Sequence, residues 1–229
     1  MIGYAMQAAM DAGLVSSGIS LFDSSRDWAF FFAFPLFFVP VLYVLDSLLC
    51  GRRVPIERGR VLVYMGLVLL VGLFGEVVVH TGWVKAFGKP LWLYRVWPVH
   101  YGYTSGVGVV MWPLYGFHLY ALHHAIRTRP ALKVFDNDYA KGLILGIDAL
   151  LMEIAANIFA LVGFGTYYFF YLPNDLFHFA SAYNFPAYFL CGIVAVKVLN
   201  FFSGLPRHRS LLGVLFLALG VAIVHFLLY

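Results

Sequence analysis

Charged side chains are scarce in this chain. Only 11% of its 229 residues are Asp, Glu, Lys or Arg, whereas 62% are hydrophobic, and the mean hydropathy is +0.86. A soluble domain is about one quarter charged, so this composition excludes an ordinary soluble protein. It predicts an integral membrane protein.

Cysteine is nearly absent too, since only Cys50 and Cys191 occur, at or inside apolar stretches. This excludes a disulfide framework and a thiolate metal site. The sequence shows no flexible linker and no clear repeat, which favours a single transmembrane helical domain over residues 1–229. Residues 1–22 lack a basic start and include Asp11, so we interpret 1–27 as an interfacial segment, not a cleaved leader.

Long apolar stretches dominate the rest of the chain. Because a helix needs about 20 apolar residues to cross a bilayer, we predict an all-α bundle of six spans at residues 28–50, 61–84, 103–126, 141–165, 183–202 and 210–229. Lys and Arg gather in three alternate loops, at residues 51–60, 127–140 and 203–209. The positive-inside rule puts these loops in the cytoplasm and both termini on the non-cytoplasmic side. Topology then explains the net charge of +4, so no nucleic-acid partner is expected.

Two long connections on the opposite, outer side are rich in aromatic residues: KPLWLYRVWPVHYGY at 89–103 and TYYFFYLPNDLFHF at 166–179. Trp and Tyr favour the headgroup layer, so these loops could form an aromatic belt. Alternatively, they form a lid over a cavity that opens among the helices. The sequence leaves both interpretations open.

Acidic residues inside the predicted spans are the main functional signal. An ionisable group at membrane depth costs at least about 2.5 to 3.5 kcal/mol on insertion scales, so it indicates function by default. At a helical rise of about 1.5 Å per residue, Glu76 and Glu153 fall at similar depths in the outer half. His80 and Asn157 follow them by one turn on the same helix faces. Two polar faces at one depth predict a shared site.

Other polar residues have weaker signals. Asp46 lies near the arginines of loop 51–60, which indicates a surface ion pair. His118 and Asp148 lie deeper toward the cytoplasm and could pair with each other, in a structural or a catalytic role. A stripe on the third predicted span is explained equally by core packing or by substrate binding. The candidate substrate-binding residues are Trp112, Tyr115 and His118 of this span, together with Tyr167 of the loop at 166–179.

Buried carboxyl groups suggest acid catalysis. A low-dielectric site favours the protonated form of a carboxyl group, so Glu76 or Glu153 is the predicted general acid. His80 and Asn157 would orient the carboxyl groups or a water molecule, and Asp148 is a further catalytic candidate. Nearby aromatic faces would stabilise a developing cation. These features suit protonation of an alkene or epoxide in a lipid, followed by cyclisation, isomerisation or hydration.

Two other classes remain open. One is a metal-dependent membrane lipid oxidase, because mixed His and carboxylate ligands suit iron, zinc or manganese. Its alternative ligand set is Glu76, His80, His100, Asp175 and His178. A haem held by His residues of two spans, such as His80 and His225, is a further variant. The other class is a non-catalytic membrane subunit that binds a lipid, a pigment or a partner helix and pairs its buried carboxylates internally.

Several short motifs occur in a recognisable order. Glu76 is followed by TGW and FGKPLWLY, Asp148 and Glu153 precede TYYFFYLP, and YNFP around Asn184 comes next. This order resembles the membrane-embedded carotenoid hydratases and small transmembrane terpenoid cyclases, over about half of the chain. The resemblance implies an isoprenoid substrate and acid-initiated chemistry without a cofactor.

Overall fold

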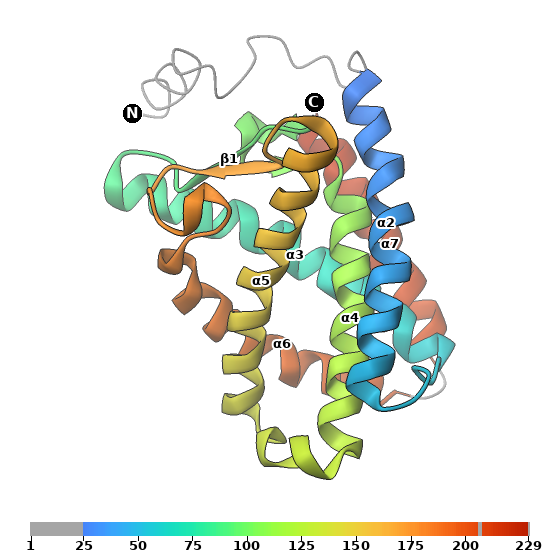
Figure 1. Ribbon diagram of the computed structural model, residues 1–229. Helices are drawn as coiled ribbons and strands as arrows, with labels where there is room; N and C mark the ends of the chain where they lie inside the picture. The colour runs from blue at the N-terminus through green and yellow to red at the C-terminus, as the bar shows by residue number, and fades with distance from the viewer. Residues whose placement is uncertain (1–24, 206–207, 229) are drawn as a thin grey trace.

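The computed structural model describes residues 25–205 and 208–228, and most of them are helical. The predicted interfacial segment 1–27 therefore lies almost entirely outside the described residues. The described chain has six long helices, which Figure 1 labels. They are α2 (Ser25–Cys50), α3 (Arg58–Phe87), α4 (Gly108–Thr128), α5 (Asp138–Phe164), α6 (Phe185–Ser203) and α7 (Arg209–Leu228).

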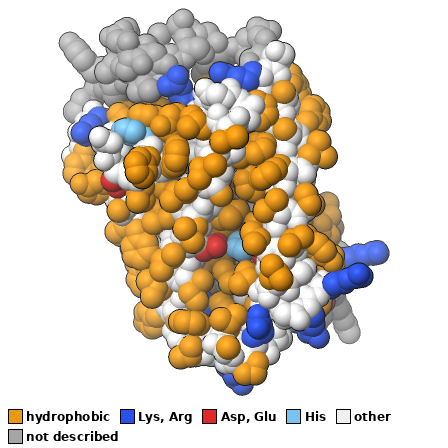
Figure 2. All heavy atoms as spheres, viewed as in Figure 1, with side chains coloured by type: hydrophobic (Ala, Val, Ile, Leu, Met, Phe, Trp, Pro, Cys, Tyr) orange, Lys and Arg blue, Asp and Glu red, His pale blue; other side chains and the backbone are white. Residues whose placement is uncertain are grey.

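Five helical segments of the described chain are long and apolar enough to cross a membrane. They are Ser25–Cys50, Arg58–Phe87, Asp138–Phe164, Ala182–Ser203 and Arg209–Phe226. Figure 2 shows hydrophobic side chains over the middle of one face, with Lys and Arg mainly toward its two ends. This distribution is typical of a multi-pass helical membrane protein.

Helix α4 departs from the prediction of six equivalent spans. It begins at Gly108, five residues later than predicted, and it is not among the five segments of sufficient apolarity. Polar residues such as His118, His123 and His124 lower its hydropathy. Helix α4 packs against both α2 and α3. Much of its surface is therefore covered by protein and not by lipid.

The helices pack against one another in several pairs. Helix α3 packs against α4 and α7, α5 packs against α6, and α2 packs against α4. Close approach of α3 and α4 depends on Gly116, where an added Cβ would lie 2.6 Å from the carbonyl oxygen of Tyr64. Small residues serve this purpose at helix interfaces in membranes.

The two aromatic loops, at residues 89–103 and 166–179, pair with each other. Strand β1 (Trp92–Tyr94) lies antiparallel to β4 (Phe169–Tyr171), with Leu93 opposite Phe170. Within the first loop, β2 (Pro98–Val99) pairs with β3 (Thr104–Ser105). Short 3₁₀ turns complete the connections: η1 (His100–Gly102), η2 (Pro130–Phe135), η3 (Leu176–His178) and η4 (Ala182–Asn184).

This paired region covers one end of the bundle, as Figure 1 shows for β1. Trp92, Tyr94, Phe169 and Tyr171 are all at most 5% exposed. They share one core cluster with Phe34 of α2 and with other helix residues. Since these rings face the protein interior, the structure favours the lid over the aromatic belt.

Candidate functional site

A cavity of about 150 Å³ lies beneath the lid. Helices α2 to α6 and strands β1 and β4 all contribute to its wall, which is largely apolar. Glu76 of α3 and Glu153 of α5 both line it. The two glutamates, which their similar depths predicted to share a site, therefore line the same cavity.

Glu76 is held by two hydroxyl groups from the first outer loop. Tyr94 of β1 donates a hydrogen bond to Oε1, and Thr104 of β3 donates one to Oε2. The carboxyl group is buried, and Trp112 lies beside it on the cavity wall. Both carboxyl oxygens of Glu76 therefore accept a hydrogen bond.

Glu153 is bonded on one oxygen only. Its Oε1 accepts hydrogen bonds from Tyr171 of β4, at 2.6 Å, and from Tyr188 of α6. Asn184 supports this arrangement by donating to the Tyr171 hydroxyl at 2.9 Å. Oε2 is buried and has no hydrogen-bond partner among the described residues. The two carboxyl groups thus differ in how they are satisfied.

The tyrosines from the lid remain hydrogen-bond donors. Burial, followed by the charge of the adjacent Glu76, raises the pKa of the Tyr94 hydroxyl well above its usual value. Burial and the adjacent Glu153 do the same for the pKa of the Tyr171 hydroxyl. Both hydroxyl groups therefore keep their protons at neutral pH.

The two glutamates correspond in their hydrogen-bond partners. Each glutamate accepts a hydrogen bond from the tyrosine that follows it by 18 residues, Tyr94 after Glu76 and Tyr171 after Glu153. Both tyrosines lie on strands that are paired with each other. The lid segments that follow α3 and α5 thus each supply one tyrosine to the glutamate of the preceding helix.

The turns that follow these strands are also alike. Tyr101 (φ 61, ψ 21) and Phe177 (φ 56, ψ 29) each lie at the centre of a left-handed turn. Ser105 accepts a hydrogen bond from the backbone N–H two residues on, at 3.1 Å, and Ser181 does so at 3.3 Å. The two lid segments therefore share their local turn geometry.

His80 and Asn157 do not orient the carboxyl groups as expected. His80 is fully buried and stacks on Tyr103, with ring centroids 3.6 Å apart. Neither of its ring nitrogens has a hydrogen-bond partner among the described residues. Asn157 instead holds the lid backbone, as it donates to the Phe179 carbonyl at 2.7 Å and accepts from the Tyr168 N–H at 2.9 Å.

The candidate substrate-binding residues divide into two groups. Trp112 and Tyr115 line the cavity, whereas His118 and Tyr167 are not part of its wall. Tyr167 lies in the second outer loop, where its ring is 5.1 Å from that of Phe170. The sequence pattern identified aromatic residues near the site, but it did not show which of them face the cavity.

A second buried polar cluster ties three helices together. His118 of α4 lies between two carboxyl groups, with Nδ1 2.6 Å from Asp46 Oδ1 and Nε2 3.1 Å from Asp148 Oδ1. The expected pairing of His118 with Asp148 is present. Asp46, however, is fully buried and is not the surface partner of an arginine that its position suggested. Nearness to Arg52 and Arg53 in the sequence was misleading, because Asp46 faces α4.

Loss of the shared histidine is expected to destabilise the bundle. His118→Leu would leave the Asp46 and Asp148 carboxyl groups without their common partner. Breaking a buried pair costs about 3 to 5 kcal/mol. The apparent melting temperature of the purified protein should fall by several degrees. His124→Leu on the same helix is the matched control, because its contact with Arg52 is exposed; equal effects of the two changes would contradict this role.

The alternative metal ligands do not come together. No group of three or more His, Cys, Asp or Glu residues suited to a metal ion occurs in the part of the chain that the structure describes. Asp175 accepts hydrogen bonds from Ser181 and from the Ala182 N–H. His178 bonds the Tyr171 carbonyl at 2.7 Å, and His100 lies edge-on to Tyr103.

The most direct partners of the carboxyl groups were missed from the sequence: Tyr94, Thr104, Tyr171 and Tyr188. A signal for two of them was present, since a tyrosine follows each glutamate at the same spacing of 18 residues. Nothing in the local pattern identifies Thr104 or Tyr188, because their contacts depend on how the lid and α6 pack.

The chain matches no protein-family model, and comparisons with curated proteins and with solved structures found no significant match. The geometry of the site is therefore the main guide to function.

Proposed function

We propose that this protein is a membrane-embedded enzyme that protonates a carbon–carbon double bond, or an epoxide, of a hydrophobic isoprenoid lipid. The observation that carries the proposal is the pairing of two differently bonded carboxyl groups in one apolar cavity. The five apolar helices support the bilayer as its environment. In this proposal the arginine-bearing loops lie on the cytoplasmic side, as the positive-inside rule predicts.

Glu153 is the proton donor in this proposal. A protonated carboxyl group needs one oxygen that can carry and release a proton. Oε1 is occupied by the hydroxyl groups of Tyr171 and Tyr188, whereas Oε2 has no partner. The proton therefore belongs on Oε2, where no protein acceptor competes with the substrate.

Glu76 has the complementary role. Both of its oxygens accept hydrogen bonds from hydroxyl donors, an arrangement that favours the carboxylate. A fixed negative charge in an apolar cavity stabilises a positive charge that develops nearby. The faces of Trp92, Trp112 and Phe169, which line the same cavity, add to this stabilisation.

The proposed step needs no oxidant or reductant. The alkene π electrons form a C–H bond with the Glu153 proton, which leaves a carbocation on the neighbouring carbon and a carboxylate on Glu153. The cation then loses a different proton from a neighbouring carbon, is attacked by a second double bond to give a new cation that loses such a proton, or is captured by water, which then loses a proton to leave an alcohol. Each route releases one proton, which restores the acid. The outcomes are isomerisation, cyclisation and hydration, respectively.

Deuterium incorporation tests the proposal directly. The purified protein in phospholipid nanodiscs is incubated in D₂O with an extract of isoprenoid lipids, and the recovered lipids are analysed by mass spectrometry. For an alkene substrate we expect a product with deuterium on carbon. For an epoxide substrate we expect a ring-opened product without carbon-bound deuterium, because the acid delivers its proton to oxygen. An unchanged lipid pool, together with a pigment or phospholipid that co-purifies with the protein, would instead support the non-catalytic binding protein.

A further inference from the structure

The cavity is too small to enclose a whole isoprenoid lipid. Its volume of about 150 Å³ is similar to that of an engineered protein cavity that accommodates benzene, about 150 Å³. One terminal isoprene unit fits such a space. A longer substrate must therefore extend out of the cavity while its reactive end lies near Glu153.

The cavity wall is closed along α2 and at the lid. Phe34, Phe38 and Leu42 of α2 are at most 3% exposed, and the lid residues above are also buried. Half-buried wall residues occur on α4 and α5, and also where α3 and α6 face each other. The exposed and half-buried wall residues there are Val71, Gly72, Gly75 and Val79 of α3 and Ala187, Tyr188, Cys191 and Ala195 of α6.

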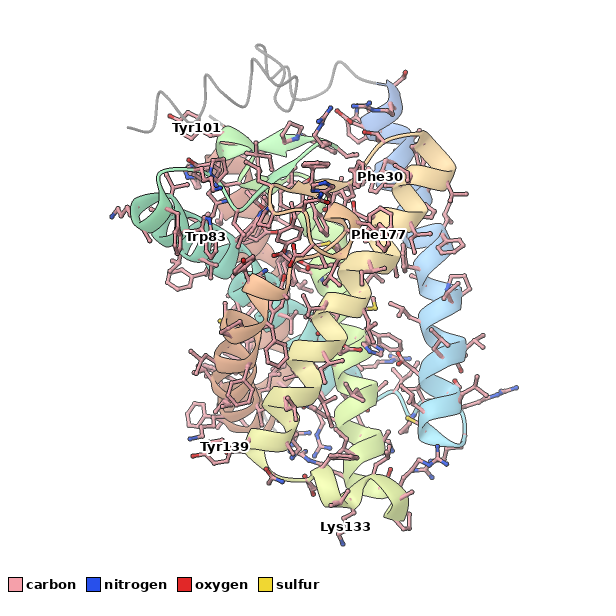
Figure 3. All side chains as sticks on the ribbon, turned by 60° about the vertical axis from the view of Figure 1, so that its left-hand side comes forward. Phe30, Trp83, Tyr101, Lys133, Tyr139 and Phe177 are labelled. Carbon is pink, nitrogen blue, oxygen red and sulfur yellow. The ribbon has the colours of Figure 1, made fainter. Side chains whose placement is uncertain are left out.

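Packing above and below defines the limits of this gap. Toward the start of α3, Leu67 and Val68 share a core cluster with Val196 and Leu199 of α6. Toward the lid, the rings of Trp83 and Tyr183 lie 5.7 Å apart. Figure 3 shows Trp83 projecting from the lid end of α3. Between these two contacts, a Cβ added at Gly75 would meet nothing within 4 Å.

We propose that this window between α3 and α6, with Gly75 on one rim and Cys191 on the other, admits the end of an acyclic isoprenoid hydrocarbon from the bilayer. The inference rests on the proposed function for the role of Glu153. The rim residues are small or apolar, so the segment that passes between them is an apolar chain and not a charged headgroup. Glu153 belongs to the wall of the same cavity, so a double bond that enters the cavity comes close to this side chain.

Cys191 provides a native reporter, because it is exposed whereas Cys50 is buried. The full chain in phosphatidylcholine nanodiscs is treated with N-phenylmaleimide, and labelling of Cys191 is followed by mass spectrometry. Squalene, an acyclic isoprenoid hydrocarbon, is expected to slow this labelling by about tenfold. Gly75→Trp, which fills the window, is expected to slow it by a similar factor. Cys191→Ser gives the background.

Gly82→Trp is the matched control. It lies two turns further along the same helix, its added Cβ would also meet open space, and it is not part of the cavity wall. It should leave labelling unchanged. Wild-type labelling in Gly75→Trp would overturn the window, and absence of protection by squalene would overturn the ligand class.

These results are separable from the proposed chemistry. Protection by squalene without any deuterated product would leave the window in place and reject the proposed catalysis. Deuterated product from a Gly75→Trp protein at the wild-type rate would reject the window and leave the catalysis in place.

Discussion

Replacing Glu153 with Gln is expected to abolish product formation while the protein stays folded. The amide preserves the shape of the side chain and an oxygen that can accept from Tyr171 and Tyr188. It cannot donate an acidic proton. General acid catalysis contributes about 10² to 10⁴ in rate, so deuterium incorporation should fall by at least about a hundredfold.

Glu76→Gln gives the matched comparison. It removes a negative charge but no acidic proton, because the bonded carboxyl oxygens indicate a carboxylate. We expect it to slow turnover with a smaller loss than Glu153→Gln. Equal melting temperatures of both variants and the wild type would show that folding is intact. If Glu153→Gln retains turnover and Glu76→Gln loses it, the two roles are reversed and the assignment of the donor is wrong.

Replacing Asn157 with Ala is expected to cause a large loss of stability. This fully buried side chain makes three hydrogen bonds to the lid backbone, with Tyr168, Phe169 and Phe179. Alanine would leave two N–H groups and one carbonyl unsatisfied, and each costs about 1 to 3 kcal/mol when buried. The total loss should therefore be about 3 kcal/mol or more.

The change should be visible in two measurements. The apparent melting temperature of the detergent-solubilised protein should fall, and hydrogen exchange should become faster in residues 166–181, which Asn157 holds in place. Asn200→Ala is the control, because the Asn200 side chain accepts one hydrogen bond from Arg127 and does not contact the lid. A lid that exchanges at the wild-type rate in Asn157→Ala would contradict the anchoring role.

Hydropathy along the sequence predicted the positions of the helices well. The spacing of polar residues along a helix did not predict which polar groups bond each other. Hydropathy placed all six helices of the described chain within a few residues of their bounds. The same reasoning treated α4 as an ordinary span, although its surroundings are largely protein. Spacing of one helical turn suggested His80 and Asn157 as partners of the carboxyl groups, whereas the partners came from the lid.

The polar contacts were not predicted because they join residues that are far apart in the sequence. Spacing along a helix indicates which side chains share a face, but it does not show what that face meets. His80 faces the aromatic rings of Trp92 and Tyr103, so it does not bond Glu76. Asp46 faces His118 across the interface of α2 and α4, at a separation of 72 residues.

The sequence by itself determined that this is a helical, strongly apolar chain, and that Glu76 and Glu153 lie at similar depths on two helices. Composition and periodicity suffice for this, because burial in a membrane depends on the sum of local transfer free energies. Only the tertiary structure decided that the outer loops pair as a lid, that Tyr94 and Tyr171 hold the two carboxyl groups, and that one oxygen of Glu153 remains unpartnered. Those features depend on strand register and helix packing, which bring together residues that are distant in the chain.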